Sequence, residues 1–394
     1  MNRRSFLKTS ILAAAAVNSS FSIKAASRET VRIGYLPITD ATPLLIAHAN
    51  KYFEAEGLTA EPPALIRNWS ALAESFLAGK FNVVHLLLPI PIWMRYNNKS
   101  SVKIVAWDHL NGSAFTVRND AGIQNFSDLG GKHIAVPHWY SMHNVILQMG
   151  LKKAGLKPII VPHTNDLKKD EVNLLLLPPP EMPTALASKR IEGFIVAEPF
   201  NALAELKLKA KIMRFTGDMW KNHPCCVVVM KEDLIKSDPV FTQKVVNAVV
   251  RSQKWILQNL GKTAEILSNE GKGYLPMPKE TLMRVFTNYD PAIYGKGQNP
   301  QAIKHPEWGV KRIGFQPYPF PSATRFIFKQ MQQTVVQGDN TFLQKYTPDF
   351  VAKDLVVYDF IKNAIRNSGG TGAFTDLKIG SPTDTWEREE VIEL

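Results

Sequence analysis

Cysteine is nearly absent from this 394-residue chain: only Cys225 and Cys226 are present, and they are adjacent. Such a pair cannot build the disulfide framework that stabilises small secreted domains. Long hydrophobic runs are missing too, since no apolar stretch reaches the roughly 20 residues that a membrane helix needs. We therefore expect a chain without a transmembrane helix, folded around ordinary hydrophobic cores.

Catalytic and nucleotide-binding motifs are also lacking. The sequence contains no phosphate-binding loop, no dinucleotide fingerprint, no serine elbow and no zinc-protease helix. A nucleophile, a base and an orienting group do not occur in motif spacing. We therefore expect a binding protein without a cofactor rather than an enzyme.

The segment 1–26 has the pattern of a secretory signal peptide. It starts with Arg3 and Arg4, continues with the short apolar run 11–17, and ends in the small residues Ala25-Ala26. Paired arginines followed by Phe-Leu-Lys are typical of the twin-arginine export route. No cysteine stands near the predicted cleavage region to carry a lipid anchor. The expected location is therefore the periplasm, with the protein free in solution there.

The charge of the exported chain narrows the choice of partner. Leaving out the four basic residues of the signal lowers the net charge from +12 to about +8. This diffuse excess suits an anionic ligand. Basic residues form no block, and the compartment is wrong for nucleic acid, so a nucleic-acid partner is not expected.

Strand and helix signals alternate between residues 31 and 197, which is typical of α/β layers. We expect strands at 31–35, 83–88, 102–107, 133–136, 159–161, 172–177 and 194–196. The expected helices between them are 42–56, 69–78, 141–154 and 182–188. After Cys226 the pattern predicts mostly helix, at 238–260, 263–268, 279–287, 322–337 and 352–364.

This organisation predicts two lobes. Lobe I comprises 27–117 plus 223–366, because the late helices must cover something already built, and lobe II comprises 118–222. The aromatic stretch 288–321 is too apolar for a flexible linker and is expected to pack as a structured excursion. The acidic tail 367–394 is expected to be a surface strap or partly disordered.

Several motifs resemble a known family. The segments DLGGKHIAVP at 128–137 and ASKRIEGF at 187–194, followed by Glu198-Pro199-Phe200, are similar to second-domain motifs of periplasmic solute-binding proteins of ABC importers. Residues 136–144 and 220–224 resemble the nitrate, bicarbonate and sulfonate subgroup, which is related to taurine and thiamine-precursor binders. The resemblance extends over nearly the whole exported chain.

The resemblance implies an α/β fold of the bilobal type II periplasmic-binding-protein kind, with two Rossmann-like lobes, a hinge and a ligand cleft. It implies a monomer that captures a small polar or anionic solute, similar to nitrate, bicarbonate or a sulfonate. An ABC permease in the inner membrane would receive that solute. Hinge closure would present the new surface that the permease recognises.

Candidate ligand contacts stand in loops at strand ends and at helix amino ends, where open α/β sheets bind ligands and backbone N–H groups can hold an anion. They are Thr39, Asp40, Trp93, Ser113, His138, Trp139, Ser141, Glu198 and Lys221.

Each candidate also has an ordinary structural explanation. Thr39 or Asp40 would cap the helix that begins near residue 42; if Asp40 faces the cleft instead, it disfavours an anion and favours a ligand that is positive or donates hydrogen bonds. Ser141 is either a helix cap or a ligand contact. The aromatic residues Trp93 and Trp139 are either pocket walls or packing. Lys221 is the best candidate cation by its position in the motif.

The identity of the ligand stays open. Nitrate-type relatives would be expected to carry a glutamine near 111–114, where this chain has Ser113, and no cysteine pair after Pro224. Metal binding by His138, His143, His223, Cys225 and Cys226 is an alternative, since their atoms suit a soft or borderline ion. Binding of a pyrimidine or thiamine precursor, and an enzyme of the pyrimidine-synthase type, are further alternatives. A redox or metal role of the cysteine pair is not decided by spacing.

Overall fold

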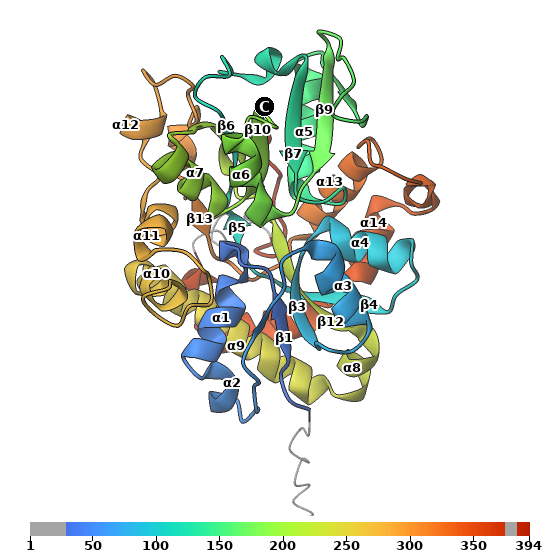
Figure 1. Ribbon diagram of the computed structural model, residues 1–394. Helices are drawn as coiled ribbons and strands as arrows, with labels where there is room; N and C mark the ends of the chain where they lie inside the picture. Colours follow the sequence, from blue (N-terminus) through green and yellow to red (C-terminus); the bar gives the residue numbers. More distant parts are fainter. Residues whose placement is uncertain (1–28, 375–383) are drawn as a thin grey trace, which may run out of the picture.

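A computed structural model describes residues 29–374 and 384–394, so the predicted signal segment 1–26 lies outside the described residues (Figure 1). The described chain forms two α/β lobes, one above the other in Figure 1, and each lobe is built around its own sheet. None of the described helices combines the length and apolar character required to cross a membrane.

The lower lobe contains a five-stranded sheet in the order β2-β1-β3-β12-β4. The first three strands are parallel, whereas β12 runs antiparallel to both of its neighbours. All residues of β1 and β3 are buried, as expected for strands covered on both faces. The strands are β1 (Ile33–Tyr35), β2 (Ala64–Leu65), β3 (Val83–Leu87), β4 (Val102–Trp107) and β12 (Cys226–Lys231).

The upper lobe contains a six-stranded sheet in the order β11-β6-β10-β7-β9-β8. Strands β10, β7, β9 and β8 are parallel, and β6 pairs antiparallel with β10 and β11. The strands are β6 (Ser113–Val117), β7 (Lys132–Val136), β8 (Lys157–Ile159), β9 (Glu171–Leu176), β10 (Gly193–Ala197) and β11 (Lys211–Phe215). The helices of this lobe are α5 (Met142–Lys153), α6 (Met182–Ala187) and α7 (Phe200–Leu208).

Helices of the lower lobe come from both ends of the chain. The long α9 begins where the Asp238 side chain accepts a hydrogen bond from Phe241 N–H at 2.8 Å, and it packs against α1, α2 and α15. The helices are α1 (Thr42–Ala49), α2 (Tyr52–Ala55), α3 (Trp69–Leu77), α4 (Pro89–Tyr96), α8 (Glu232–Ser237), α9 (Pro239–Gln258), α10 (Leu260–Leu267), α11 (Lys279–Thr287), α13 (Pro321–Met331), α14 (Pro348–Leu355) and α15 (Tyr358–Asn367). The short helix α12 (Pro291–Tyr294) lies instead on the upper lobe, where Tyr294 packs on Phe215 of β11 (Figure 1).

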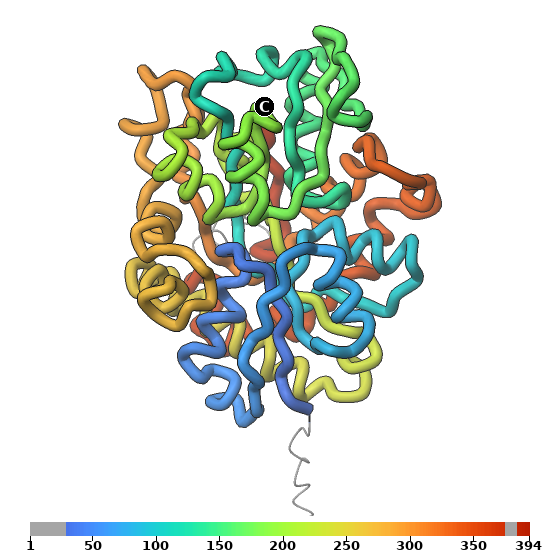
Figure 2. Tube along the Cα trace, in the orientation of Figure 1, coloured from blue at the N-terminus to red at the C-terminus, as the bar shows by residue number. Residues whose placement is uncertain are grey.

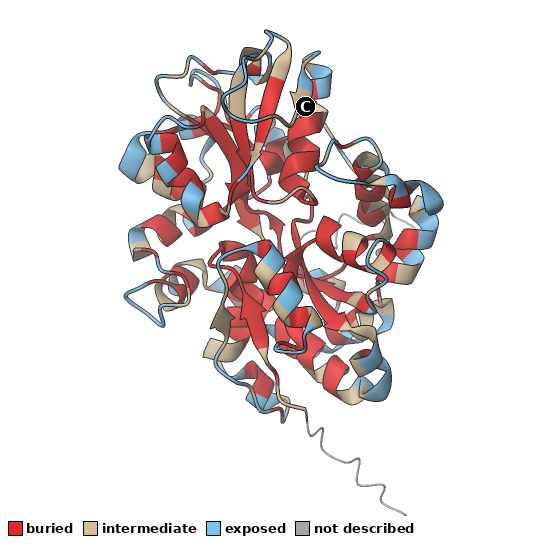
Figure 3. Ribbon diagram, turned by 45° about the vertical axis from the view of Figure 1, so that its right-hand side comes forward, coloured by how far each residue is buried: buried red, intermediate tan, exposed pale blue. Residues whose placement is uncertain are grey.

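The chain passes between the lobes at 108–112, ahead of β6, and returns at 216–225, ahead of β12 (Figure 2). Buried residues run through both sheets and across the region where the lobes meet (Figure 3). The aromatic stretch 288–321 is structured as expected, with α12 and the short strand β13 (Ile313–Gly314), which pairs with β5 (Leu110–Asn111) beside the first crossing.

The helices predicted after Cys226 begin at residue 238, so the strand β12 that the chain forms first was not predicted. Val227, Val228 and Val229 are β-branched and fully buried, and this composition suits a strand covered on both faces. The strand inserts between β3 and β4, more than a hundred residues earlier in the chain. The antiparallel β12 therefore completes the lower sheet.

Two predicted helices are each divided in two. The helix expected at 42–56 is interrupted at Lys51, which adopts a left-handed conformation with φ 57° between α1 and α2. The helix expected at 352–364 is interrupted because Val356 forms a β-bridge with Ile104, and the N–H of Val357 donates to Ile104 O at 2.9 Å. Pairing with β4 therefore overrides helical propensity there.

The described part of the tail runs from the lower lobe to the upper lobe. Trp386 packs on Tyr318, with ring centroids 4.5 Å apart, and the Arg388 guanidinium lies 5.2 Å from the Trp107 ring. Further along, the side chain of Glu390 accepts from Trp220 Nε1 at 2.7 Å, and the Leu394 carbonyl accepts from Lys153 Nζ at 2.5 Å. This segment therefore fastens residues of both lobes.

Candidate functional site

The two lobes touch through buried polar groups. The backbone N–H of Thr39 in the lower lobe donates to the carbonyl of Glu198 in the upper lobe at 2.9 Å, and its hydroxyl donates to the same carbonyl at 3.2 Å. Nearby, the rings of Trp93 and Tyr140 stack across the interface with centroids 5.7 Å apart. The predicted contacts Thr39, Trp93 and Glu198, and the loop around Tyr140, therefore meet where the lobes join.

Sheet topology explains why polar residues gather at this interface. The carboxyl ends of β1, β3 and β4 lie at the same edge of the lower sheet as the amino end of the antiparallel β12. Asp40 follows β1, His109 follows β4, and Cys225 and Cys226 stand at the start of β12. Such an edge is where α/β sheets bind ligands.

These four residues form what we call the interface cluster: Asp40, His109, Cys225 and Cys226. One ligand atom from each lies within 4.8 Å of the others, and all four side chains are buried. His109 Nε2 is 2.8 Å from Asp40 Oδ2, and the Cys226 thiol donates to the same oxygen at 3.1 Å.

The upper lobe closes over the interface cluster with Ser113 and His143. Ser113 Oγ lies 2.9 Å from His143 Nε2 and 3.8 Å from Cys225 Sγ. Cys225 Sγ is also 4.0 Å from His143 Nε2. Ser113 begins β6 and His143 stands in the first turn of α5, so the contacts join the two lobes.

The charge states of Asp40 and His109 are coupled. Burial raises the pKa of Asp40 to about 6, although the neighbouring His109 opposes the rise. Burial alone would lower the pKa of His109, but the charge and hydrogen bond of Asp40 outweigh it, and this pKa rises to about 10. At neutral pH the two residues therefore form a buried ion pair.

The two thiols are driven in opposite directions. Burial alone would raise the pKa of Cys225, but the adjacent Cys226 side chain and the nearby His143 and His109 hold this pKa well below its usual range. The pKa of Cys226 lies well above its usual range because of burial, the hydrogen bond with Cys225 and the charge of Asp40. The Asp40 carboxylate and the lowered pKa of Cys225 both make the interface cluster unfavourable for an added anion.

Several buried polar atoms around the interface cluster have no hydrogen-bond partner among the described residues. They include both carboxylate oxygens of Asp108, one oxygen of Asp40, and the Nδ1 atoms of His85, His109 and His143. Such atoms are normally satisfied in folded proteins by protein, water or ligand. The concentration of unsatisfied groups at one interface therefore distinguishes it from an ordinary core.

The remaining predicted contacts have other local roles. Ser141 Oγ accepts from the N–H of Asn144 at 3.0 Å, so it is the N-cap of α5. Nδ1 of the half-buried His138 accepts from the N–H of Tyr140 at 3.1 Å, and desolvation lowers the pKa of this histidine to about 4. Trp139 is half-buried beside it.

Lys221 does not join the interface cluster. Its backbone N–H donates to the carbonyl of Val391 in the C-terminal segment at 3.0 Å. Glu198 is fully buried, and its carboxylate lies 2.6 Å from Nη2 of Arg312. The expectation that Thr39 or Asp40 caps the helix after them is wrong, because α1 begins without a side-chain cap.

Of the residues considered for metal binding, His143, Cys225 and Cys226 come together. His223 uses both ring nitrogens locally, with Nε2 2.7 Å from Thr216 Oγ1 and Nδ1 2.9 Å from Pro224 O. Sequence reasoning missed His109, although its position directly after the predicted strand 102–107 was the available signal.

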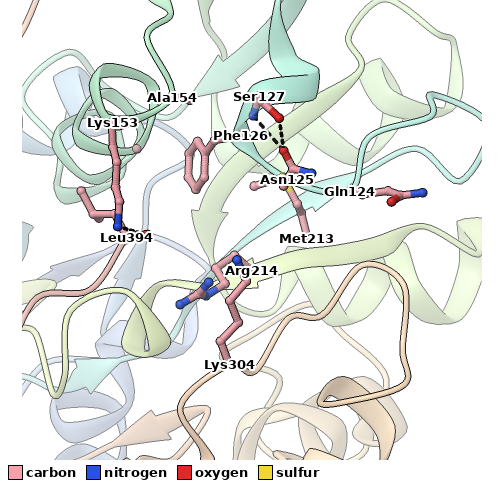
Figure 4. Close-up of a pocket in the computed structure, with 11 residues that line it drawn as sticks. Gln124, Asn125, Phe126, Ser127, Lys153, Ala154, Met213, Arg214, Lys304 and Leu394 are labelled. Carbon is pink, nitrogen blue, oxygen red and sulfur yellow. Dashed lines mark hydrogen bonds between the residues drawn. The ribbon is translucent and has the colours of Figure 1, made fainter.

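A separate pocket of about 200 Å³ opens on the upper lobe away from the interface cluster (Figure 4). It is lined by basic side chains, Lys153, Arg214 and Lys304, and by the last residue, Leu394. Arg214 pairs with Asp218, with Nε 2.6 Å from Oδ2. Leu394 itself occupies part of the wall, so the C-terminal segment contributes to this surface.

Comparison with known proteins agrees with the two-lobed architecture. The chain is 26% identical over 296 residues to the nitrate/nitrite binding protein NrtA of Nostoc, and this match spans 70% of the chain but only 64% of that relative. The crystal structure of the periplasmic nitrate-binding protein NrtA from Synechocystis matches with a TM-score of 0.73 at 17% identity, covering 92% of this chain and 93% of that one.

A zinc-bound ligand-binding component of an ABC-type import system from Staphylococcus aureus matches with a TM-score of 0.64 at 21% identity. That match covers 86% of this chain and the whole of the other. At these identities the structures establish the fold, which is that of periplasmic binding proteins, as the family resemblance implied. The model of the NMT1-like family matches residues 24–268, so this chain belongs to the NMT1-like family.

Proposed function

We propose that the protein is the extracytoplasmic solute-binding component of an ABC importer, closing its two lobes on a small polar solute. The observation that carries this proposal is the convergence of buried polar side chains from both lobes at one interface. Ser113 and His143 approach Cys225 from the opposite lobe, so a hinge motion would open and close the site. The nitrate-binding relative supports the same role.

The observations support a solute-binding role more strongly than they support any one chemical class of solute. Support for a nitrate-like, bicarbonate-like or sulfonate-like anion comes from the relatives, and Lys221 remains the predicted cation for it. The interface cluster itself has the acid Asp40 and two thiols, and such groups favour a cation or a solute that donates hydrogen bonds. The sequence predicts the same preference for a positive or hydrogen-donating ligand if Asp40 faces the cleft.

Export by the twin-arginine route, a periplasmic location, an inner-membrane permease partner and a monomeric state belong to the same proposal. The signal pattern at 1–26 supports export, and the import-system relatives support the permease. Binding without catalysis is proposed because the nitrate/nitrite relative is a binding protein and the sequence contains no phosphate-binding loop, dinucleotide fingerprint, serine elbow or zinc-protease helix.

A ligand panel tests the proposal. Nitrate, bicarbonate, a sulfonate, a pyrimidine and Zn²⁺ would each be added to the exported form while the melting temperature and the radius of gyration are measured. A ligand at 100 times its dissociation constant stabilises the native state by about 2.7 kcal/mol. At least one solute is expected to raise the melting temperature and compact the protein. A panel without either effect would remove the support for solute capture.

The variant Lys221→Ala addresses the anion directly. If Lys221 makes a charged hydrogen bond to an anionic solute, its loss should weaken binding by about 1.5–3 kcal/mol. Lys168→Ala is the matched control, because this lysine is 80% exposed and pairs only at the surface with Glu171. Equal affinities in both variants would remove Lys221 from the binding site.

A further inference from the structure

We infer that the interface cluster of Asp40, His109, Cys225 and Cys226 binds a transition metal ion, with Zn²⁺ as the best-fitting ion. The inference rests on the proposed function, because it names the class of solute that the two lobes enclose. It is carried by four ligating side chains of three chemical types that converge from separate strands at the lobe interface.

The spacing of the ligand atoms suits one ion. Tetrahedral zinc bonds of about 2.0 Å to oxygen or nitrogen and 2.3 Å to sulfur place neighbouring ligand atoms roughly 3.3–3.8 Å apart. In the interface cluster the closest pairs are already 2.8 and 3.1 Å apart, and every pair lies within 4.8 Å. Shifts of about 1 Å or less would therefore bring all four atoms to coordination distance.

The donor set selects among ions. Ca²⁺ and Mg²⁺ prefer oxygen ligands, so two sulfur atoms and an imidazole exclude them as the best occupants. Thiolate sulfur, imidazole nitrogen and carboxylate oxygen are all ligand types that Zn²⁺ accepts, and four of them complete its tetrahedral coordination. On binding, the ion forms bonds to both sulfur atoms, to Asp40 and to Nε2 of His109. Each thiol that is still protonated, and the protonated Nε2 of His109, releases its proton to solvent. No electron transfer is involved.

The surroundings hold the ligands in place. Gly112 packs against the His109 ring: a Cβ added at Gly112 would lie 2.9 Å from His109 Nδ1. This close approach directs Nε2 toward Asp40, at 2.8 Å. The neighbouring Asp108 is fully buried, and both of its carboxylate oxygens are unpartnered among the described residues.

The lobe interface also supplies an entry route. The four ligands belong to the lower lobe, while Ser113 and His143 cover Cys225 from the upper lobe at 3.8 and 4.0 Å. Separation of the lobes would expose the ligands to solvent, and closure would place His143 beside the bound ion. An ion bound here would therefore be enclosed by hinge closure, as a transported solute must be.

The test uses the exported form of the whole chain, freed of metal by a chelator and kept reduced. Zn²⁺ alone is titrated in competition with a chromophoric chelator, and Co²⁺ is added separately to report thiolate ligation by its charge-transfer absorption. The variants are Cys225→Ser/Cys226→Ser and Asp40→Asn, which preserve side-chain shape. His163→Gln is the matched control, because His163 is exposed and outside the interface cluster.

One Zn²⁺ per chain is expected, with thiolate absorption for Co²⁺. Removing a residue that only hydrogen-bonds to a metal ligand typically weakens metal binding by roughly 10–100-fold. The double cysteine variant removes two ligands, so its Zn²⁺ affinity should fall by more than that. His163→Gln should bind Zn²⁺ as tightly as the parent does. The Zn²⁺ affinities of the variants are compared only where the metal-free variant shows the melting curve of a folded protein. The Co²⁺ spectrum of the parent tests thiolate ligation independently of any substitution.

The outcomes separate the metal site from the importer role. Stabilisation by an anion of the panel without stoichiometric Zn²⁺ binding would overturn the metal site and leave the importer proposal standing. Equal Zn²⁺ affinity in the parent and the cysteine variant would also overturn it, because the ion would then bind elsewhere. Cysteine-dependent Zn²⁺ binding without compaction by any panel member would keep the metal site and remove the importer role.

Discussion

The buried Arg312 provides a sharp test of how the excursion 288–321 is tied to the upper lobe. Its guanidinium is 1% exposed and lies 2.6 Å from Glu198 and 2.8 Å from Glu205. Glu198 is fully buried, and its carbonyl accepts the hydrogen bonds of Thr39 at the lobe interface. Loss of the arginine should therefore destabilise both the excursion and the lobe contact.

The expected magnitude follows from burial. Removing one partner of a buried ion pair leaves an uncompensated charge and costs about 3–5 kcal/mol. Arg312→Met should lower the free energy of unfolding by this amount, measured by urea denaturation with circular dichroism at constant m-value. Adding Glu198→Gln to that variant removes a stranded charge, so the double variant should be about 0.5–3 kcal/mol more stable than the sum of the single effects.

The matched control is Arg325→Met. Arg325 is 37% exposed and pairs with surface acids, so its loss should cost about 0–1 kcal/mol. A cost below about 1 kcal/mol for Arg312→Met would refute the argument from buried charge. Strict additivity in the double variant would show that Arg312 and Glu198 are not energetically coupled, and this too would contradict the reasoning.

Three further perturbations test other contacts. Burial would raise the pKa of Asp354, but hydrogen bonds from neighbouring arginine and tyrosine side chains lower it to about 2. The ionised Asp354 should therefore contribute about 1 kcal/mol to the free energy of unfolding after solvent screening, fully above pH ~4 and progressively less toward pH ~2. Urea denaturation of the parent and of Asp354→Asn at pH 6 and pH 2.5 should show that the difference in unfolding free energy between the two proteins shrinks at the lower pH. A difference that stays constant would contradict the lowered pKa. Ser141→Ala should cost about 1 kcal/mol of unfolding free energy as a lost N-cap, and no measurable cost would contradict the capping role. Gly112→Ala should destabilise more than Gly122→Ala: both glycines have positive φ, but only the Cβ at Gly112 would meet the ring of His109. Equal melting temperatures of the two glycine variants would contradict that contact.

The alternation of strands and helices was predictable from local pattern. The strand 102–107 and the helix 279–287 were predicted with the bounds that the structure has. Both are delimited by polar, Gly or Pro residues, which end regular structure locally. The helix predicted at 42–56 was wrong at Lys51, because a left-handed residue within a helical pattern leaves no period signal.

The candidate site was only half predictable. Asp40 and the cysteine pair were considered on residue type, but their contact with His109 depends on β12 pairing between β3 and β4. That order is set by tertiary packing, which periodicity along the chain does not record. Lys221 stays a prediction from its motif position, because the contact from its backbone N–H to the carbonyl of Val391 does not involve the side chain.

The C-terminal segment bears directly on how the lobes can move. Arg388 lies over the Trp107 ring of the lower lobe, while Lys153 of the upper lobe donates to the Leu394 carbonyl. Because the segment contacts both lobes, separation of the lobes must either carry it along as a hinge strand or break one set of its contacts. The contacts with Lys153 are at the chain end and at the surface, so they are the ones that opening can release at least cost. Opening by this route would expose the interface cluster and leave Arg388 over the Trp107 ring of the lower lobe.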